Sequence, residues 1–146
     1  MEKNSIEHPD FGTLVWNEDF ERYATSVGHG PDAFDLGFEE SDANRLAELL
    51  DAAASLWRDR EKWLAQWRKS CFKYYVNELK AEWYEGEEPL DEDRFNEKIG
   101  QPAGIDFSWN DGNLHYMITG MDDDLIGDHA LEAHGTGLTP DEICLT

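Results

Sequence analysis

Basic residues are scarce in this chain, and acidic residues are not. Only 12 lysines and arginines accompany 33 aspartates and glutamates in 146 residues, so the formal net charge is −21 at pH 7. A field of that sign repels the phosphates of nucleic acids and the head groups of anionic membranes, and it attracts basic surfaces. We therefore expect no direct binding of nucleic acid or membrane, and we expect a basic partner.

Cysteines and long apolar runs are scarce as well. The two cysteines, Cys71 and Cys144, stand far apart and form no pair motif, which fits a reducing compartment. No apolar stretch follows the N-terminal residues as a secretory signal would require, and no run approaches the length of a membrane span. We therefore predict a cytoplasmic protein.

Aromatic residues, in contrast, are plentiful. Six Trp, seven Phe and five Tyr contribute to a hydrophobic content of 40%, which is enough to build a core. Disordered acidic tails are poor in aromatic residues, so the chain does not belong to that class. Its length is that of one common domain, and we predict that residues 1–146 form a single domain.

Hydrophobic periodicity divides the chain into three blocks. Strands are expected at about 11–38, helices at about 41–85 and 90–99, and strands again at about 104–145, with edge strands at 130–134 and 143–145. The order of strands, helices and strands favours an α+β fold. In that fold, an antiparallel sheet from the N- and C-terminal strand blocks carries a central helical pair packed on one face.

The segment 41–85 is too long for one helix in a compact domain. Ser41 is expected to cap its N-terminus with Asp42 in the first turn, and no Gly or Pro follows until Gly86. One unbroken helix would measure about 67 Å at about 1.5 Å per residue, whereas the radius of gyration of such a domain is about 15 Å. We predict a break within the polar residues 58–62. The alternative is one long protruding helix that dimerises.

The register of one hairpin follows from its turn and from its apolar residues. Asp111-Gly112 is a favoured pair for a two-residue type I′ turn, which pairs Asn110 with Asn113. The same register places three apolar pairs on one face of the hairpin: Trp109 with Leu114, Phe107 with Tyr116, and Ile105 with Ile118. Turn chemistry and burial pattern therefore predict the same pairing.

No catalytic or metal-binding motif stands out. The acidic run 122–128 begins like a calcium loop, but Ala133 stands where the bidentate glutamate is needed. His115, His129 and His134 share the last block, yet their spacing does not show convergence with a thiolate or a carboxylate. We predict a protein that is not an enzyme and has no cofactor. An enzyme or metal-binding domain built on these three histidines is the alternative.

Acidic residues are concentrated after residue 80, where seventeen acids accompany only two bases. Such a field steers an oppositely charged partner, so we predict a non-enzymatic acidic binding or inhibitor protein. Its most concrete form is an immunity protein that neutralises a basic toxin or nuclease, and a DNA-mimic inhibitor is a further alternative. The candidate contact residues are Glu87, Glu88, Asp91, Glu92, Asp93, Asp122, Asp123 and Asp124.

Two segments resemble small bacterial domains of uncharacterised function. The segment from His8 to Trp16 is similar to the Phe-Gly-x-Leu-x-Trp strand that opens those domains. Residues 126–132 are similar to their Gly-His-containing end strand, with Asp128 standing between the glycine and the histidine. Several such families are encoded near polymorphic toxins, so the resemblance implies an immunity role. It carries no catalytic residue to this chain.

Overall fold

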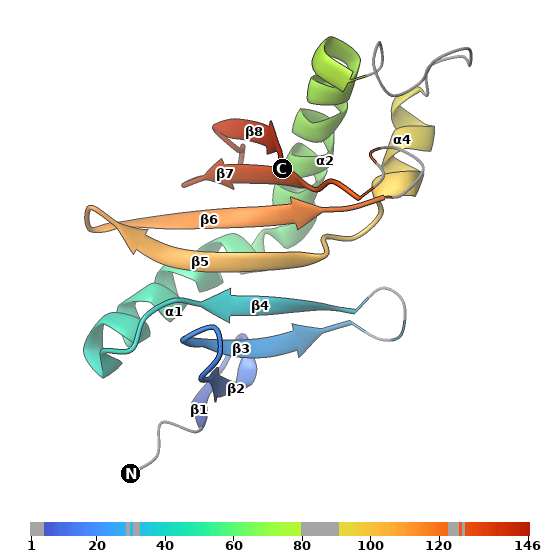
Figure 1. The fold of residues 1–146 in the computed structure, drawn as a ribbon. Helices are drawn as coiled ribbons and strands as arrows, with labels where there is room; N and C mark the ends of the chain where they lie inside the picture. The colour runs from blue at the N-terminus through green and yellow to red at the C-terminus, as the bar shows by residue number, and fades with distance from the viewer. Residues whose placement is uncertain (1–4, 29, 31–32, 80–90, 123–125, 127) are drawn as a thin grey trace.

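The computed structural model describes residues 5–28, 30, 33–79, 91–122, 126 and 128–146. These residues form one eight-stranded sheet whose strands follow one another in chain order (Figure 1). The strands are β1 (Ser5–His8), β2 (Gly12–Asn17), β3 (Arg22–Val27), β4 (Phe34–Phe38), β5 (Gly104–Asn110), β6 (Asn113–Gly120), β7 (Leu131–Gly135) and β8 (Glu142–Leu145). The predicted combination of helices with a sheet is confirmed, and the sheet is mostly antiparallel.

One pair of strands is parallel, which corrects the expectation of an antiparallel sheet throughout. β4 and β5 pair in parallel, with Phe38 beside Phe107. Between them the chain forms α1 (Ala43–Arg58), α2 (Arg60–Tyr74), the π-helix η2 (Tyr75–Leu79) and α4 (Glu92–Ile99). This helical crossover returns the chain to the end of the sheet where β4 begins, and parallel neighbours require such a connection.

Two strands differ from their predicted places. β1 at Ser5–His8 lies before the predicted strand block, and it pairs with β2 at the edge of the sheet. Its four residues include one aliphatic side chain, Ile6, so the sequence signal for a strand is weak. β7 was expected at an edge, but it pairs with both β6 and β8, which leaves β8 as the edge strand.

The predicted helix break is confirmed. α1 ends at Arg58 and α2 begins at Arg60, and the N–H of Asp59 donates to the carbonyls of Leu56 and Trp57. The single long helix is therefore wrong. The N-cap of α1 is Asp42 and not Ser41, because the Asp42 carboxylate accepts hydrogen bonds from the backbone N–H groups of Asn44 and Arg45.

The predicted β5–β6 hairpin is confirmed pair by pair, from Asn110 opposite Asn113 to Ile105 opposite Ile118. Asp111 and Gly112 have φ values of 53° and 79°, as a type I′ turn requires. The hairpin is also tied to the helices, since Trp109 Nε1 donates to the carbonyl of Arg45 at 3.0 Å.

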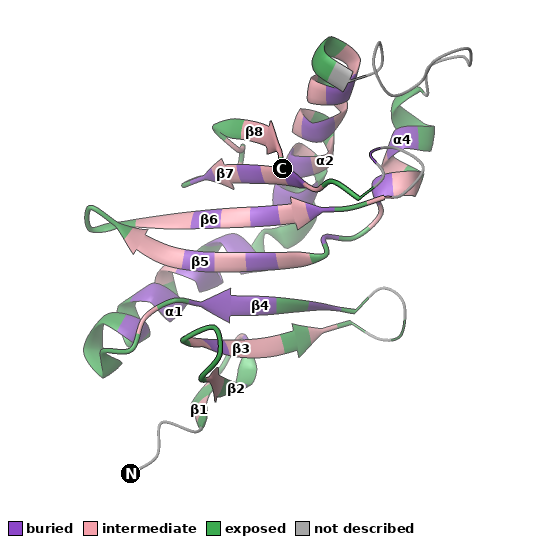
Figure 2. Cartoon of the chain, viewed as in Figure 1, coloured by how far each residue is buried: buried purple, intermediate pink, exposed green. Residues whose placement is uncertain are grey.

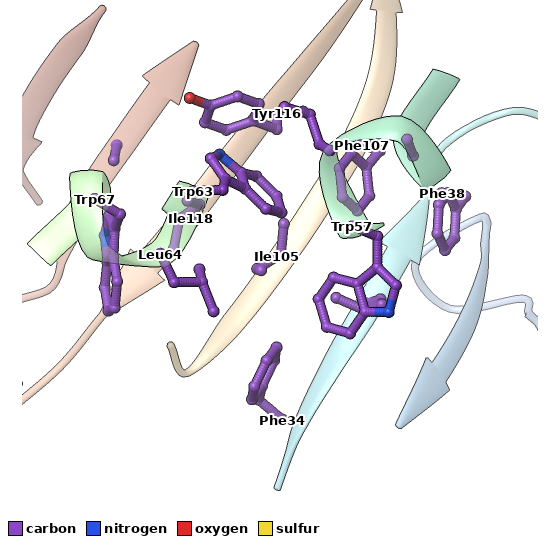
Figure 3. Close-up of a cluster of buried hydrophobic side chains, with 14 of the residues drawn as sticks. Phe34, Phe38, Trp57, Trp63, Leu64, Trp67, Ile105, Phe107, Tyr116 and Ile118 are labelled. Atoms are coloured by element: carbon purple, nitrogen blue, oxygen red, sulfur yellow. The ribbon is translucent and has the colours of Figure 1, made fainter. Parts of the chain in front are cut away.

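The core joins helix side chains to alternate residues of the sheet (Figures 2 and 3). Trp63 of α2 lies with its ring centroid 4.9 Å from that of Tyr116 and 5.9 Å from that of Phe107. Phe107 in turn stacks on Phe38 of the neighbouring strand at 5.1 Å. Because side chains alternate along a strand, the residues between these positions project from the opposite face of the sheet.

Candidate functional site

Chemically active side chains lie on that opposite face, on the last three strands. Strand pairing places Glu132 of β7 directly opposite Cys144 of β8, and His134 opposite Met117 of β6. All four are half-buried, whereas Ala133, between Glu132 and His134, is fully buried in the core. Two ligand-type side chains of one strand therefore face a thiol on its neighbour.

These side chains converge into one group, which we call the β6–β8 cluster: Glu132, His134, Cys144 and His115. The carboxylate, imidazole and thiol donor atoms of Glu132, His134 and Cys144 all lie within 4.8 Å of one another. His134 Nε2 lies 3.5 Å from Glu132 Oε1. The ring of His115, on β6, stacks on that of His134 with centroids 5.4 Å apart.

The thiol of Cys144 has an acidic surrounding. Its pKa is raised above the ordinary value by partial burial and, secondarily, by the negative charges of Glu132 and Glu142. Cys71 differs, because burial in the core raises its pKa to about 12 and a thiol of that kind is inert. Of the two cysteines, Cys144 is therefore the one placed among other ligand-type groups.

The three histidines named from the sequence separate in the structure. His115 and His134 come together on one face of the sheet, whereas His129 precedes β7 and its Nδ1 lies 2.9 Å from the carbonyl oxygen of Thr146. Sequence reasoning missed Glu132 and Cys144. The sequence shows that Glu132 and His134 alternate along a strand. Their approach to Cys144 depends on the β7–β8 register, and no turn motif of fixed length in the sequence predicts that register.

The acidic candidates are only partly described. Glu87, Glu88, Asp123 and Asp124 lie outside the described residues. Asp91 is the N-cap of α4, where its carboxylate accepts the Arg94 N–H at 2.8 Å, and Glu92 and Asp93 follow it, exposed, in the first helical turn. Asp122 is half-buried after β6. As a docking surface this set stays a prediction.

A different set of acids lies at one end of the sheet. The β2–β3 turn, the end of β4 and the β5–β6 turn share this end, because Tyr23 pairs with Phe38 and Phe38 with Phe107 (Figure 1, left). We call the acids of these three connections the acidic rim: Glu18, Asp19, Glu21, Glu39, Glu40, Asp42 and Asp111. All of them except Glu40 are exposed.

Arginine side chains neutralise few of the described carboxylates. At the rim, Arg45 Nε lies 3.5 Å from Glu40, and Arg22 pairs with Asp106 on the face of the sheet. Elsewhere Arg58 pairs with Asp10. Two arginines bind backbone carbonyls instead: Arg60 donates to the carbonyl of Trp57, and Arg68 donates to that of Gly100. Some guanidinium groups therefore neutralise carboxylates, and others stabilise the backbone by hydrogen bonds.

Comparisons with protein-family models, curated proteins and solved structures found no match to this chain. In the described part of the chain, no helix combines the length and the apolar character that a membrane crossing requires.

Proposed function

We propose that this protein is a non-enzymatic acidic binding protein that neutralises a basic protein partner. In its most concrete form it is an immunity protein that covers the positively charged cleft of a toxin or nuclease. The observation that supports the proposal best is the acidic rim, where three separate connections bring seven carboxylates to one end of the sheet.

Charge physics favours a basic occupant for such a surface. Like charges held close together repel one another, and a cationic partner relieves that repulsion while it is steered toward the surface. The net charge of −21 extends the same field over the whole molecule. We further propose that α1 and α2 together cover the core-forming face of the sheet, which is the face opposite the β6–β8 cluster. The rim, at the end of the sheet, then stays accessible.

The binding experiment compares three variants with the same change in charge. Glu18→Gln with Asp19→Asn alters the rim, Glu92→Gln with Asp93→Asn alters the start of α4, and Glu61→Gln with Asp128→Asn is a control at two other exposed acids. The partner is sought first among proteins encoded beside this one. It is then purified, and its affinity is measured by calorimetry at several salt concentrations.

We expect a partner with an excess of Lys and Arg and an affinity that falls steeply as salt rises. The rim variant should bind about tenfold more weakly, since each exposed charge pair contributes up to about 1 kcal/mol. The control should bind like the wild type. Salt-insensitive binding, or equal losses in rim and control variants, would contradict the proposal. A loss in the α4 variant alone would move the contact to Asp91, Glu92 and Asp93.

A further inference from the structure

We propose that the β6–β8 cluster is a metal site for Zn²⁺, with Glu132, His134 and Cys144 as ligands and His115 as the fourth. This inference does not depend on the proposed function, because its residues lie on the face of β6–β8 and not among the rim acids.

The backbone already holds three ligands near coordinating distance. Ligands of tetrahedral zinc at about 2.0–2.3 Å from the metal lie roughly 3.5 Å from one another. The donor atoms of Glu132, His134 and Cys144 lie within 4.8 Å of one another, and that of His134 is 3.5 Å from that of Glu132. Small side-chain rotations therefore suffice, and the paired strands that carry these residues need not move.

The donor types select the metal. A thiolate favours zinc and other borderline or soft ions over Ca²⁺ and Mg²⁺, which take oxygen ligands. Imidazole and carboxylate complete a set that zinc accepts. His115 lies on the neighbouring strand with its ring stacked on that of His134, centroids 5.4 Å apart, so a second imidazole stands beside the group as the candidate fourth ligand.

An ordinary ion pair explains part of the cluster but not all of it. Glu132 and His134 would form a weak, half-exposed pair without any metal. That pair does not include Cys144, which is paired with Glu132 across β7 and β8. The Cys144 Sγ lies 3.8 Å from the Glu132 carbonyl oxygen and within 4.8 Å of the other two donor atoms. A cation shared by all three groups stabilises the thiolate and the carboxylate together.

The test uses the full chain purified without an affinity tag and stripped with a chelator. Zn²⁺ is titrated against a competing chelator, and Co²⁺ serves as a spectroscopic probe because a cobalt–thiolate bond gives a charge-transfer absorption. We expect one ion per chain and a Co²⁺ spectrum with that absorption. Binding of Zn²⁺ should also raise the Tm of the protein.

Variants assign the ligands. Glu132→Gln, His134→Gln and Cys144→Ser should each weaken Zn²⁺ binding by about 100-fold or more, since even the loss of an outer-shell partner costs about 10–100-fold. Cys144→Ser should also lose the charge-transfer absorption. His129→Gln, a matched histidine outside the group, should bind as the wild type does. His115→Gln should also weaken Zn²⁺ binding, because His115 is the fourth ligand.

Several results would overturn the proposal. The first is a wild-type protein that binds no Zn²⁺ stoichiometrically, and the second is a Co²⁺ complex without thiolate absorption. Equal affinities of the Cys144→Ser and wild-type proteins would reduce the site to a histidine–carboxylate surface pair. Unchanged affinity in His115→Gln would overturn its assignment as a ligand. Circular dichroism of the metal-free variants checks that each still folds. The cobalt spectrum of the wild type tests the thiolate ligand even if a variant does not fold.

Discussion

Tyr116 shows how closely side chains and backbone fit in this core. Its ring is fully buried against Trp63, and its hydroxyl donates to the carbonyl of Gly137 at 2.6 Å. Burial raises the pKa of Tyr116 to about 12, so the hydroxyl remains a neutral donor. Gly135 lies against the same ring, where a Cβ atom would stand 2.6 Å from the hydroxyl oxygen and 3.1 Å from Cα of Pro140.

This crowding predicts opposite outcomes for two glycines in one short segment. Gly135→Ala should destabilise the protein by about 1–3 kcal/mol, because the buried ring and the backbone of Pro140 cannot both move away from the new methyl group. Gly137→Ala should change the free energy of unfolding little, or raise it by up to about 1 kcal/mol, since nothing lies within 4 Å of its added Cβ. Urea denaturation measures both, and equal stabilities would refute the packing account.

The central helices illustrate how short-range chemistry sets the limits of an element. Apolar residues at helical spacing predicted one stripe through α1 and α2, and Leu49, Ala53, Trp63 and Trp67 are indeed fully buried. The polar residues that follow Trp57 predicted the break, which occurs at Asp59. The choice of N-cap was wrong by one residue, because both Ser41 and Asp42 are good caps and only the backbone geometry decides between them.

The capping prediction is tested by two neighbouring substitutions. Asp42→Ala should lower the free energy of unfolding by about 0.5–2 kcal/mol, because the N–H groups of Asn44 and Arg45 lose their acceptor. Ser41→Ala, next to it and outside the cap, should have little effect. Chemical denaturation of both variants decides the matter. A larger loss for Ser41→Ala would show that the capping role belongs to the serine.

Over the whole molecule, charge predicts how stability depends on pH and salt. Burial raises the pKa of Asp106 above 3.8, against the opposing effect of Arg22. The folded state therefore binds this proton more tightly, and the contribution of Asp106 to stability grows as pH falls toward 3.8. The pKa of Asp10 is lowered by its hydrogen bond to Arg58, so its contribution is lost only below 3.8.

Relief of self-repulsion at a net charge of −21 stabilises the fold on mild acidification, and the Asp106 effect adds to it as the pH approaches 3.8. We expect the Tm to rise by a few degrees from about pH 8 to about pH 5, where about 1 kcal/mol corresponds to about 3–5 °C for a chain of this size. Added salt at the higher pH should raise the Tm as well. Calorimetry measures both responses, and as the pH is lowered further toward 3.8 the Asp106→Asn variant should gain less stability than the wild type. A Tm that falls on acidification, or that ignores salt, would contradict this account.

Local patterns by themselves determined much of this protein. The Asp111-Gly112 turn and the alternating apolar residues on either side of it predicted every pair of the β5–β6 hairpin. Helical spacing predicted the buried stripe, and Gly100 marked the end of α4. Each of these features depends on residues that lie close together in the sequence, so one continuous segment is enough to predict it.

Tertiary structure alone decided the parallel β4–β5 pair and the composition of both surfaces. More than sixty residues separate Phe38 from Gly104, and no pattern in them predicts that β5 pairs with β4. The loop between β7 and β8 likewise has no motif that sets Glu132 opposite Cys144. Pairing between distant segments is selected by the burial of the whole core and not by any one segment, so the rim and the β6–β8 cluster emerge only when the chain folds.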